Sequence, residues 1–519
     1  MNSQTKHTIN SNSKRIAKNT LLLYFRMIIL MLVSLYTSRV ILDALGEADY
    51  GIYNVVGGVV SMFSVLSSTL SGAISRFITY ELGTGNKERL SKIFSTSVNI
   101  QLLMAVLIFL LCEIIGVWFL NTKMNIPDGR MEAANWVLHF SIASFAVNLV
   151  SLPYNATIIA HERMSVFAYI SILEAALKLL IAYFIYVSPI DKLILYGSLI
   201  LGVSLIIRII YGFYCGRHFE EAKYRLVFDR SLLKEMASFA SWNLFGNTAY
   251  MLNTQGVNML INVYFGVTCN AARAIAVQVD TAVTQFVNNF MTAINPQITK
   301  SYATGDYEYM AKLVCRGTKY SFFIMYLFVV PMVLEAENIL GIWLKEVPAD
   351  TAIFMQLVLF STLAQLLGGP LYTSIMATGK IKRYQMEVTI IGCLVFPLSW
   401  IAYELGAPAY MTYVIFALIY FLLNFIRLAT LKRQMDFPVW MYIRSVFGRI
   451  GPCAVLMFIA PALLVMFMQP SFIRLLLVCV VSLLWSVICI YYVGLEQGER
   501  SFFLDKSKQL LANKFHINI

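Results

Sequence analysis

The sequence has 519 residues, of which 59% are hydrophobic and only 13% are charged. Soluble domains carry about 25% charged residues, so this composition excludes an ordinary soluble domain and favours a protein of the lipid bilayer. The net charge of +12 would fit a nucleic-acid partner, but in a membrane protein the positions of Lys and Arg decide what a basic balance means.

Apolar stretches recur along the whole chain. A helix needs roughly 20 predominantly apolar residues to cross a bilayer, and by that criterion we expect about fourteen membrane-spanning helices in an all-α integral membrane protein. Their centres fall near residues 30, 65, 105, 145, 175, 205, 250, 285, 325, 362, 392, 420, 459 and 482.

Lys and Arg are concentrated in alternate connecting segments, for example at Arg89 and Lys382, whereas the first loop on the other side is acidic, with Asp43 and Asp49. Short loops rich in Lys and Arg stay in the cytoplasm. We therefore place both termini in the cytoplasm. The basic charge is assigned to orientation and to contact with anionic lipids, and no nucleic-acid partner is expected.

Two segments of the chain resemble each other without gaps. The stretch "SRVILDALGEADYGIYNVVGG" at 38–58 aligns with "NMLINVYFGVTCNAARAIAVQ" at 258–278, so that Gly46 matches Gly266. The similarity continues from 71–94 to 291–314. An even number of helices separates the copies, so they have the same orientation. This predicts two parallel six-helix repeats, a plan that recurs in transporters. The first stretch is then an external turn between helices 1 and 2.

The repeats define the expected domains. Two C-terminal helices, 13 and 14, fall outside the repeats, and their apolar character predicts contact with lipid. The domains are an N-terminal six-helix lobe at 1–216, a cytoplasmic linker at 217–235, a C-terminal six-helix lobe at 236–430, and helices 13 and 14 with a cytoplasmic tail at 431–519.

Polar side chains inside membrane helices are costly and mark water, partners or function. Such residues concentrate in helices 1, 2, 7 and 8, which predicts a hydrated cavity between the lobes. In helix 8 they recur at spacings of four or seven residues, on one face. The candidate cavity residues are Arg26, Asn247, Asn258, Arg273, Asp280, Thr284 and Asn288.

Each of these groups also has a purely structural explanation. Asn and Gln can bridge neighbouring helices, and the serines of helix 2 are typical of close helix packing. Arg76, Arg316 and Lys319 are expected to extend to the cytoplasmic interface. Glu174 and Lys178, four residues apart, are expected to form an ion pair. Asp280 could pair with Arg26 or Arg208 on a neighbouring helix.

The eight cysteines are scattered, with no CxxC motif and no Cys/His pairing. The pattern therefore predicts neither a disulfide framework nor a metal site. No signal peptide is evident, and no external loop is large enough to hold an enzyme domain. We expect no catalytic residues and no bound cofactor.

Four features of the chain point to one known family: the segments "LGEADYGIYN" and "TAINPQITKSYATGD", the short "TGKIK" turn, and the twelve repeated helices followed by two further helices. Together they resemble the Wzx-type polysaccharide flippases. These proteins belong to the exporter superfamily that also contains the MATE drug antiporters. The resemblance covers essentially the whole chain. It implies a V-shaped pair of lobes that open alternately to the two sides of the bacterial inner membrane.

The resemblance also implies a substrate: an undecaprenyl-diphosphate-linked oligosaccharide for O-antigen, capsule or lipopolysaccharide synthesis. Arg26 and Arg273 would then hold the diphosphate, and helices 13 and 14 would contact the polyprenyl tail. Asp280 would couple transport to H⁺ or Na⁺. Other polysaccharide-assembly proteins would be partners.

Two other functions compete with this interpretation. A MATE-type exporter of cationic drugs would favour acidic residues over arginine in the cavity. A membrane polysaccharide polymerase or lipid-linked glycosyltransferase would be expected to have a large external loop or paired catalytic carboxylates, and the sequence shows neither.

Overall fold

A computed structural model describes residues 18–501, apart from positions 35, 38–39, 42, 47–48, 50–51, 54–55, 57–63, 124–125, 127–128, 226, 228 and 345–346. The described part of the chain is almost entirely helical and contains no strand, which confirms the all-α fold class. Helices prevail because a helix satisfies every backbone polar group within its own segment, as hydrocarbon requires.

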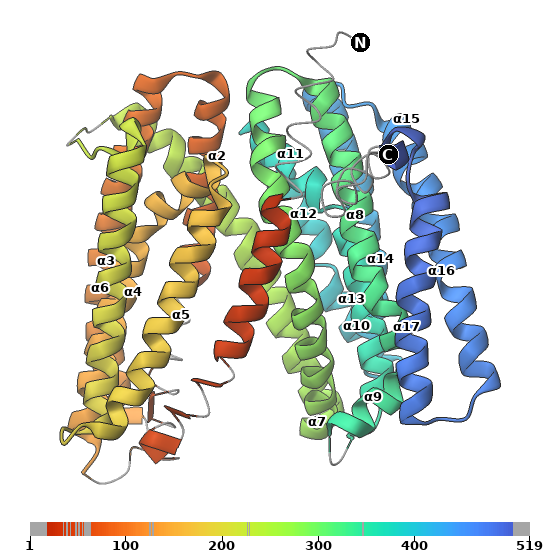
Figure 1. Ribbon diagram of the computed structural model, residues 1–519, viewed down its shortest axis with the longest axis horizontal. Helices are drawn as coiled ribbons and strands as arrows, with labels where there is room; N and C mark the ends of the chain where they lie inside the picture. Colours follow the sequence, from red (N-terminus) through yellow and green to blue (C-terminus); the bar gives the residue numbers. More distant parts are fainter. Residues whose placement is uncertain are drawn as a thin grey trace, which may run out of the picture. The chain divides into compact units, whose positions relative to one another are not determined.

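The chain divides into two compact units. The first contains the described residues up to Thr248 together with Thr292–Asp306. Its helices are the segment 18–34, α2 (Ser64–Thr84), α3 (Lys87–Lys123), α4 (Met131–Ala160), α5 (Met164–Val187), α6 (Lys192–His218) and both ends of α7 (Arg230–Ala303). Figure 1 shows α3, α4, α5 and α6 side by side as long, roughly parallel rods.

The second unit contains Ala249–Met291 and the described residues from Tyr307 onward. Its remaining helices are α8 (Tyr307–Leu334), α9 (Ala336–Trp343), α10 (Thr351–Leu366), α11 (Gly369–Thr378), α12 (Lys382–Gly392), α13 (Val395–Glu404), α14 (Met411–Met435), α15 (Val439–Tyr442), α16 (Gly448–Phe467) and α17 (Phe472–Cys489). The predicted domain boundaries stay a prediction, because compact packing and sequence repetition divide a chain by different criteria.

Ten helical segments in the described part are long and apolar enough to cross a membrane. They are Lys87–Thr122, Met131–Ala160, Met164–Tyr186, Lys192–His218, Tyr307–Leu334, Thr351–Thr378, Lys382–Glu404, Met411–Met435, Val439–Phe467 and Phe472–Gly494. Three further helical elements do not meet this criterion: the segment 18–34, α2 and α7. They are the elements that the sequence predicts to be the most polar. The protein is therefore a multi-pass membrane protein, and the count of fourteen spans stays a prediction.

Two pairs of glycines support the internal repeat. Gly46 and Gly266, which the sequence alignment matches, have φ angles of 78° and 79°. At Gly266 the backbone of α7 is not helical, so α7 consists of two helical limbs joined at this residue. Gly85 and Gly305, also equivalent in the alignment, both have φ of 75°. Only glycine adopts this conformation without strain, so equivalent positions reverse the chain in the same way in both repeats.

Equivalent residues of the repeats also meet directly. Gly83, near the end of α2, matches Ala303 at the end of α7, and a Cβ atom added to Gly83 would lie 2.6 Å from the Ala303 Cβ atom. Nearby, the buried Glu162 carboxylate accepts a hydrogen bond from Lys300 Nζ at 2.8 Å. The end of α7 thus packs tightly on α2, and only a residue without a side chain fits at position 83.

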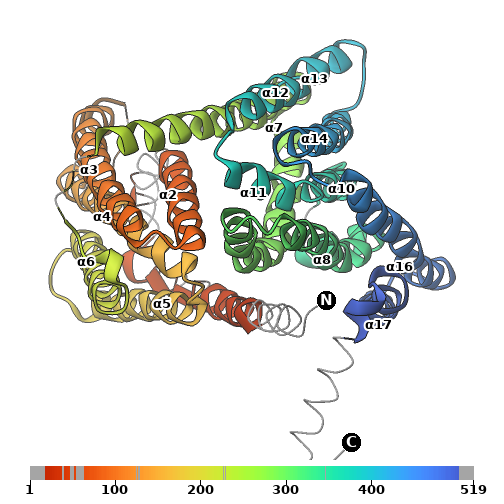
Figure 2. The ribbon, with the colours of Figure 1, turned by 90° about the horizontal axis from the view of Figure 1, so that it is seen from above.

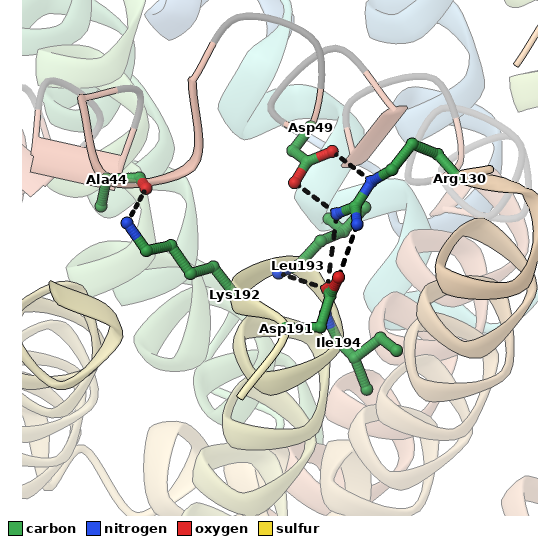
Figure 3. A network of polar contacts seen from close by, with 7 residues as sticks. All are labelled: Ala44, Asp49, Arg130, Asp191, Lys192, Leu193 and Ile194. Atoms are coloured by element: carbon green, nitrogen blue, oxygen red, sulfur yellow. Dashed lines mark hydrogen bonds and ion pairs between the residues drawn. The ribbon is translucent and has the colours of Figure 1, made fainter. Parts of the chain in front are cut away.

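The predicted external turn is held by charged side chains at the ends of α4 and α6 (Figure 3). Arg130, directly before α4, donates from Nε to Asp49 at 2.8 Å and also pairs with Asp191. Asp191 caps α6 by accepting hydrogen bonds from the backbone amides of residues 193 and 194. Lys192 Nζ donates to the carbonyl of Ala44 at 3.2 Å. One arginine therefore joins the turn to the first residues of two helices.

The helices α16 and α17 form a pair that packs on α8, and Figure 2 shows them adjacent in the second unit. They expose large apolar side chains such as Phe467 and Ile473, which is consistent with lipid contact. Near the start of α17, Arg474 Nε lies 2.7 Å from the buried carboxylate of Glu335. Beyond the other end of α17, Glu499 is buried against α8.

The partner of Glu499 corrects one expectation. Lys319 does not extend to an interface, because its side chain is only 1% exposed and its Nζ atom lies 2.9 Å from Glu499. Arg316, 3.2 Å from the same carboxylate, completes the cluster. The expectation for Lys319 was wrong because its carboxylate partner lies far along the chain, where helix spacing gives no sign of it. Buried ion pairs thus join both ends of α17 to the α8–α9 region.

We expect the substitution Glu335→Ala to destabilise the protein. It leaves Arg474 buried without its carboxylate, and loss of one partner of a buried pair costs about 3–5 kcal/mol. The thermal unfolding midpoint of the purified protein in detergent should fall clearly. Glu308→Ala is the matched control, because Glu308 pairs with Lys312 on the surface with 80% of its side chain exposed. Equal midpoints for the two variants would contradict the structural role of the Arg474 pair.

The turn network should be sensitive to acid. Burial alone would raise the pKa of Asp191, but the hydrogen bonds from Arg130 and from the α6 amides outweigh it, so the pKa is lowered. A lowered pKa stabilises the fold above the unfolded value of about 3.9, and this contribution is lost as the pH falls further. The difference in unfolding midpoint between wild type and Asp191→Asn should therefore be present at neutral pH and shrink below about pH 4. A constant difference down to acid pH would show that this carboxylate does not carry the effect.

Candidate functional site

The second limb of α7 carries the predicted polar face within the second unit. Arg273 donates from Nη1 to Asn258 Oδ1 at 2.9 Å, so these two predicted cavity residues, one from each limb of α7, lie together. Arg273 also hydrogen-bonds to Tyr413 of α14. Its Nε atom is buried and has no hydrogen-bond partner among the described residues. Asn258 therefore orients the arginine while leaving donor capacity unused.

Asp280 follows on the same face of α7. The Thr362 hydroxyl of α10 hydrogen-bonds to its carboxylate, whereas Oδ1 is buried and has no described partner. No ion pair of Asp280 occurs in the described part of the chain, and its electrostatic neighbours include Tyr250. Four residues further, the Thr284 hydroxyl is also buried and has no hydrogen-bond partner among the described residues. This face offers a carboxylate and a hydroxyl that the described protein groups do not saturate.

Arg26 and Asn247 belong to the first unit and differ in their surroundings. The Arg26 guanidinium lies over the Phe167 ring, 4.4 Å from the ring centroid, and its Nε atom is buried without a described hydrogen-bond partner. Asn247 Nδ2 donates to Thr69 Oγ1 of α2 at 3.0 Å. If Asn247 serves only to pack helices together, a hydrogen bond between α7 and α2 is the expected result. Arg26 differs, because its Nε–H donor has no partner among the described residues.

One further arginine of the first unit was not among the predicted cavity residues. Arg208 of α6 lies over the Tyr154 ring at 4.0 Å from the centroid. One turn along α6, Tyr211 hydrogen-bonds to Asn155 at 3.4 Å and interacts electrostatically with Arg26. Arg208 was expected only as a partner for Asp280. The available signal was its spacing of three residues from Tyr211, which places both side chains on one face of α6.

One carboxylate of the first unit interacts with two cations. Glu174 and Lys178 of α5 form the predicted ion pair, with Nζ and Oε1 separated by 2.6 Å. Glu174 also attracts Arg26 electrostatically. In the described structure, Lys178 and Arg26 therefore share this carboxylate.

The structure divides the predicted cavity residues between the two units. Arg26 and Asn247 lie in the first, and Asn258, Arg273, Asp280, Thr284 and Asn288 in the second. A cavity shared by the two sets stays a prediction. In the described part of the chain no group of three His, Cys, Asp or Glu side chains is placed to hold a metal ion.

Solved structures with the same fold are membrane transporters. The chain matches an outward-facing multidrug resistance MATE transporter of the MOP superfamily with a TM-score of 0.68 and 14% identity, over 81% of this chain and 97% of that one. It matches a MATE protein in the straight conformation with a TM-score of 0.69, 13% identity and the same coverage. For a MOP superfamily transporter from Pyrococcus furiosus, with a binding pocket described as reversed in polarity, the TM-score is 0.65 at 15% identity, again over 81% and 97%.

Fold and membrane helices together define the class of this protein as a multi-pass membrane protein with the fold of the MATE transporters. Residues 16–302 match the family described as polysaccharide biosynthesis protein, and the chain belongs to that family. The resemblance to the Wzx-type flippases is thereby confirmed at the level of the family. The family is thus described by polysaccharide biosynthesis, and the fold is one that solved membrane transporters share.

A curated relative is the uncharacterized membrane protein EpsK of Bacillus subtilis (strain 168). It is 19% identical over 280 residues, which cover 53% of this chain and 55% of EpsK. The match therefore spans about half of the length of that relative.

Proposed function

We propose that this protein translocates a lipid-linked oligosaccharide, carried on undecaprenyl diphosphate, from the cytoplasmic to the external face of a bacterial inner membrane. The observation that carries the proposal is the membership of the polysaccharide biosynthesis family on a transporter fold. The oligosaccharide would serve O-antigen, capsule or lipopolysaccharide synthesis. Both termini would lie in the cytoplasm, on the side where the short loops are rich in Lys and Arg.

The chemistry of such a substrate explains why a protein is needed. Sugar hydroxyls and a diphosphate cannot cross hydrocarbon unaided, because each unpaired polar group costs several kcal/mol. Arginine binds phosphate oxygens through paired, charge-assisted hydrogen bonds, and Arg26 and Arg273 both keep a buried Nε donor unused. The polyprenyl chain can remain in lipid, where the exposed apolar face of α16 and α17 would contact it.

The competing functions explain fewer of these observations. A MATE-type exporter of cationic drugs has the same fold, but unneutralised arginines within the membrane repel a cationic substrate. The Pyrococcus furiosus transporter, whose reversed pocket polarity suggests a different function for that protein, shows that this fold accepts pockets of different polarity. A polymerase or glycosyltransferase would not be expected on a transporter fold.

We expect substitution of Arg26 or Arg273 by Gln to reduce export of the surface glycan. A hydrogen bond to a charged group contributes about 1.5–3 kcal/mol, so loss of one guanidinium should lower export roughly 10- to 100-fold. Export is measured by quantifying the surface polysaccharide of a deletion strain complemented with each variant, with the amount of protein in the membrane determined in parallel.

The substitution of an exposed arginine, Arg383→Gln, is the control, since Arg383 pairs with Glu387 at the surface with 75% of its side chain exposed. Lys in place of Arg26 or Arg273 should restore part of the export, because it keeps the charge but not the paired hydrogen bonds. Normal export from the double Gln variant would rule out a role of these arginines in substrate binding.

The proposal extends to the energy source. Asp280 would couple translocation to H⁺ or Na⁺, because a buried carboxylate without an ion pair is costly unless it binds a cation or a proton. Thr362 and Tyr250 would supply the neighbouring oxygen atoms.

Replacement of Asp280 by Asn removes the titratable and cation-binding group while keeping nearly the same volume. In proteoliposomes with an imposed H⁺ or Na⁺ gradient, we expect the variant to lose the part of transport that the gradient drives while still binding substrate. Glu308→Gln, at an exposed site of α8, should behave as wild type. A wild-type response of Asp280→Asn to both gradients would exclude Asp280 as the coupling residue.

A further inference from the structure

The second limb of α7 differs from the spanning helices in what it exposes. Among its described side chains, from Gly266 to Ala303, no large apolar one is exposed. The spanning helix α3, by contrast, exposes many, such as Leu103 and Trp118. A helix that borders hydrocarbon exposes apolar side chains, whereas polar ones within the membrane face the bundle interior or water. The exposed face of this limb is therefore suited to water or to a polar ligand.

This exposed face carries a row of amides and a hydroxyl. Its polar members follow one another at spacings of three, four and three residues and are Gln278, Thr281, Gln285 and Asn288. Such spacings place side chains on one side of a helix. We call these four residues the amide row. From its first to its last member the row extends over ten residues, which is about 15 Å along the helix axis.

The hydrogen-bonding groups of the row are available to a ligand. Among the described residues, the side-chain amides of Gln278 and Gln285 have no hydrogen-bond partner. The Thr281 hydroxyl donates to the Val277 carbonyl at 2.8 Å, but its oxygen can still accept a hydrogen bond. Asn247 on the first limb differs, because its amide bonds to α2. The row is thus not explained by contacts between helices.

The chemistry of the row favours an uncharged ligand that is rich in hydroxyl groups. None of its four members is charged, so the row has no ionic partner for a phosphate or a carboxylate. A sugar hydroxyl both donates and accepts hydrogen bonds, as an amide does, and the two can bond in either direction. Ala274 and Ala282 are exposed on the same face and leave it open to a bulky ligand. A length of about 15 Å exceeds one sugar ring, so an oligosaccharide fits the row better than a monosaccharide.

The charged residues Arg273 and Asp280 lie on the flank of the amide row. Asp280 directly precedes Thr281, and successive residues of a helix are rotated by about 100°. Arg273 lies seven residues before Asp280 and so shares its face. The limb therefore has a charged flank beside a neutral row, which corresponds to a substrate with a charged part and a neutral part.

We propose that the amide row binds the sugar residues of a lipid-linked oligosaccharide through their hydroxyl and N-acetyl groups. The inference rests on the proposed function and deepens it, because it assigns recognition of the neutral glycan to the amide row and leaves the diphosphate to other residues. Gln278 and Gln285 are then specificity-determining residues.

The test compares two probes that differ only in their sugars. One is geranylgeranyl diphosphate, and the other is the same lipid linked to chitotriose, which contains three N-acetylglucosamine units. Isothermal titration calorimetry on the purified full-length protein in a neutral detergent gives both affinities, and their ratio measures the contribution of the sugars. We expect the wild type to bind the chitotriose-linked probe at least tenfold more tightly. Equal affinities would overturn the proposal.

The double variant Gln278→Ala/Gln285→Ala should lower that ratio about tenfold, because it removes two amides that bond to sugar hydroxyls. The affinity for geranylgeranyl diphosphate should not change. Alanine is the best helix former, so the fold should tolerate both substitutions. The matched control is Gln469→Ala/Gln497→Ala, since both of these glutamines are exposed and lie outside α7.

A second variant obstructs the row without removing any hydrogen-bonding group. Ala282 is exposed and lies between Gln278 and Gln285, so Ala282→Leu places a bulky side chain where the sugars would bind. It should lower the ratio severalfold and again leave the affinity for geranylgeranyl diphosphate unchanged. Wild-type ratios in this variant and in the double alanine variant would overturn the proposal.

Failure of this inference and failure of the proposed function give different results. An equal loss of affinity for both probes in the double alanine variant would contradict a row that is specific for the glycan. Neither that result nor a wild-type ratio would bear on whether the protein exports glycan. A deletion strain that still exports its surface glycan would refute the proposed function, whatever the ratio of the two affinities.

Discussion

The constraint on which the rest of this structure depends is that a charge removed from water needs a partner. At both ends of α17 the requirement is met internally, where Lys319 contacts Glu499 and Arg474 contacts Glu335. In the first unit, Arg26 and Arg208 rest on aromatic rings, and neither forms an ion pair within the described part of the chain. Paired charges hold helices together, and incompletely paired charges are the places where a ligand can supply what is missing.

Repetition of one structural plan organises these charges. The equivalent glycines at 46 and 266, and at 85 and 305, share left-handed conformations, and the equivalent residues Gly83 and Ala303 are in contact. Their helices make different polar contacts. Asn99 of α3 accepts a hydrogen bond from Tyr224 in the linker, whereas Lys319 of α8 binds the segment that follows α17. Backbone geometry was retained while each repeat acquired its own chemistry.

The polar residues of α7 show how far a functional site can be predicted from helical spacing. The shared face of Arg273, Asp280 and Thr284 follows from a period of 3.6 residues, and in the structure this face has donors and acceptors without described partners. Spacing could not reveal that Asn247 bonds to Thr69, or that Thr362 is the partner of Asp280, because those partners come from other helices. The same limitation concealed the place of Arg208 beside Tyr154.

The sequence by itself determined the membrane location, the helical fold class, the repeat and the family resemblance. These follow from composition, periodicity and local alignment, which act over short distances along the chain. Only the tertiary structure decided which charges are neutralised. Lys319 and Glu499 lie far apart in the sequence and yet form a buried pair, whereas Arg26 and Arg208 each lie over an aromatic ring and have no ion pair among the described residues. Charge pairing in a low-dielectric interior depends on distances of a few ångströms between helices, and those distances are set by packing and not by sequence order.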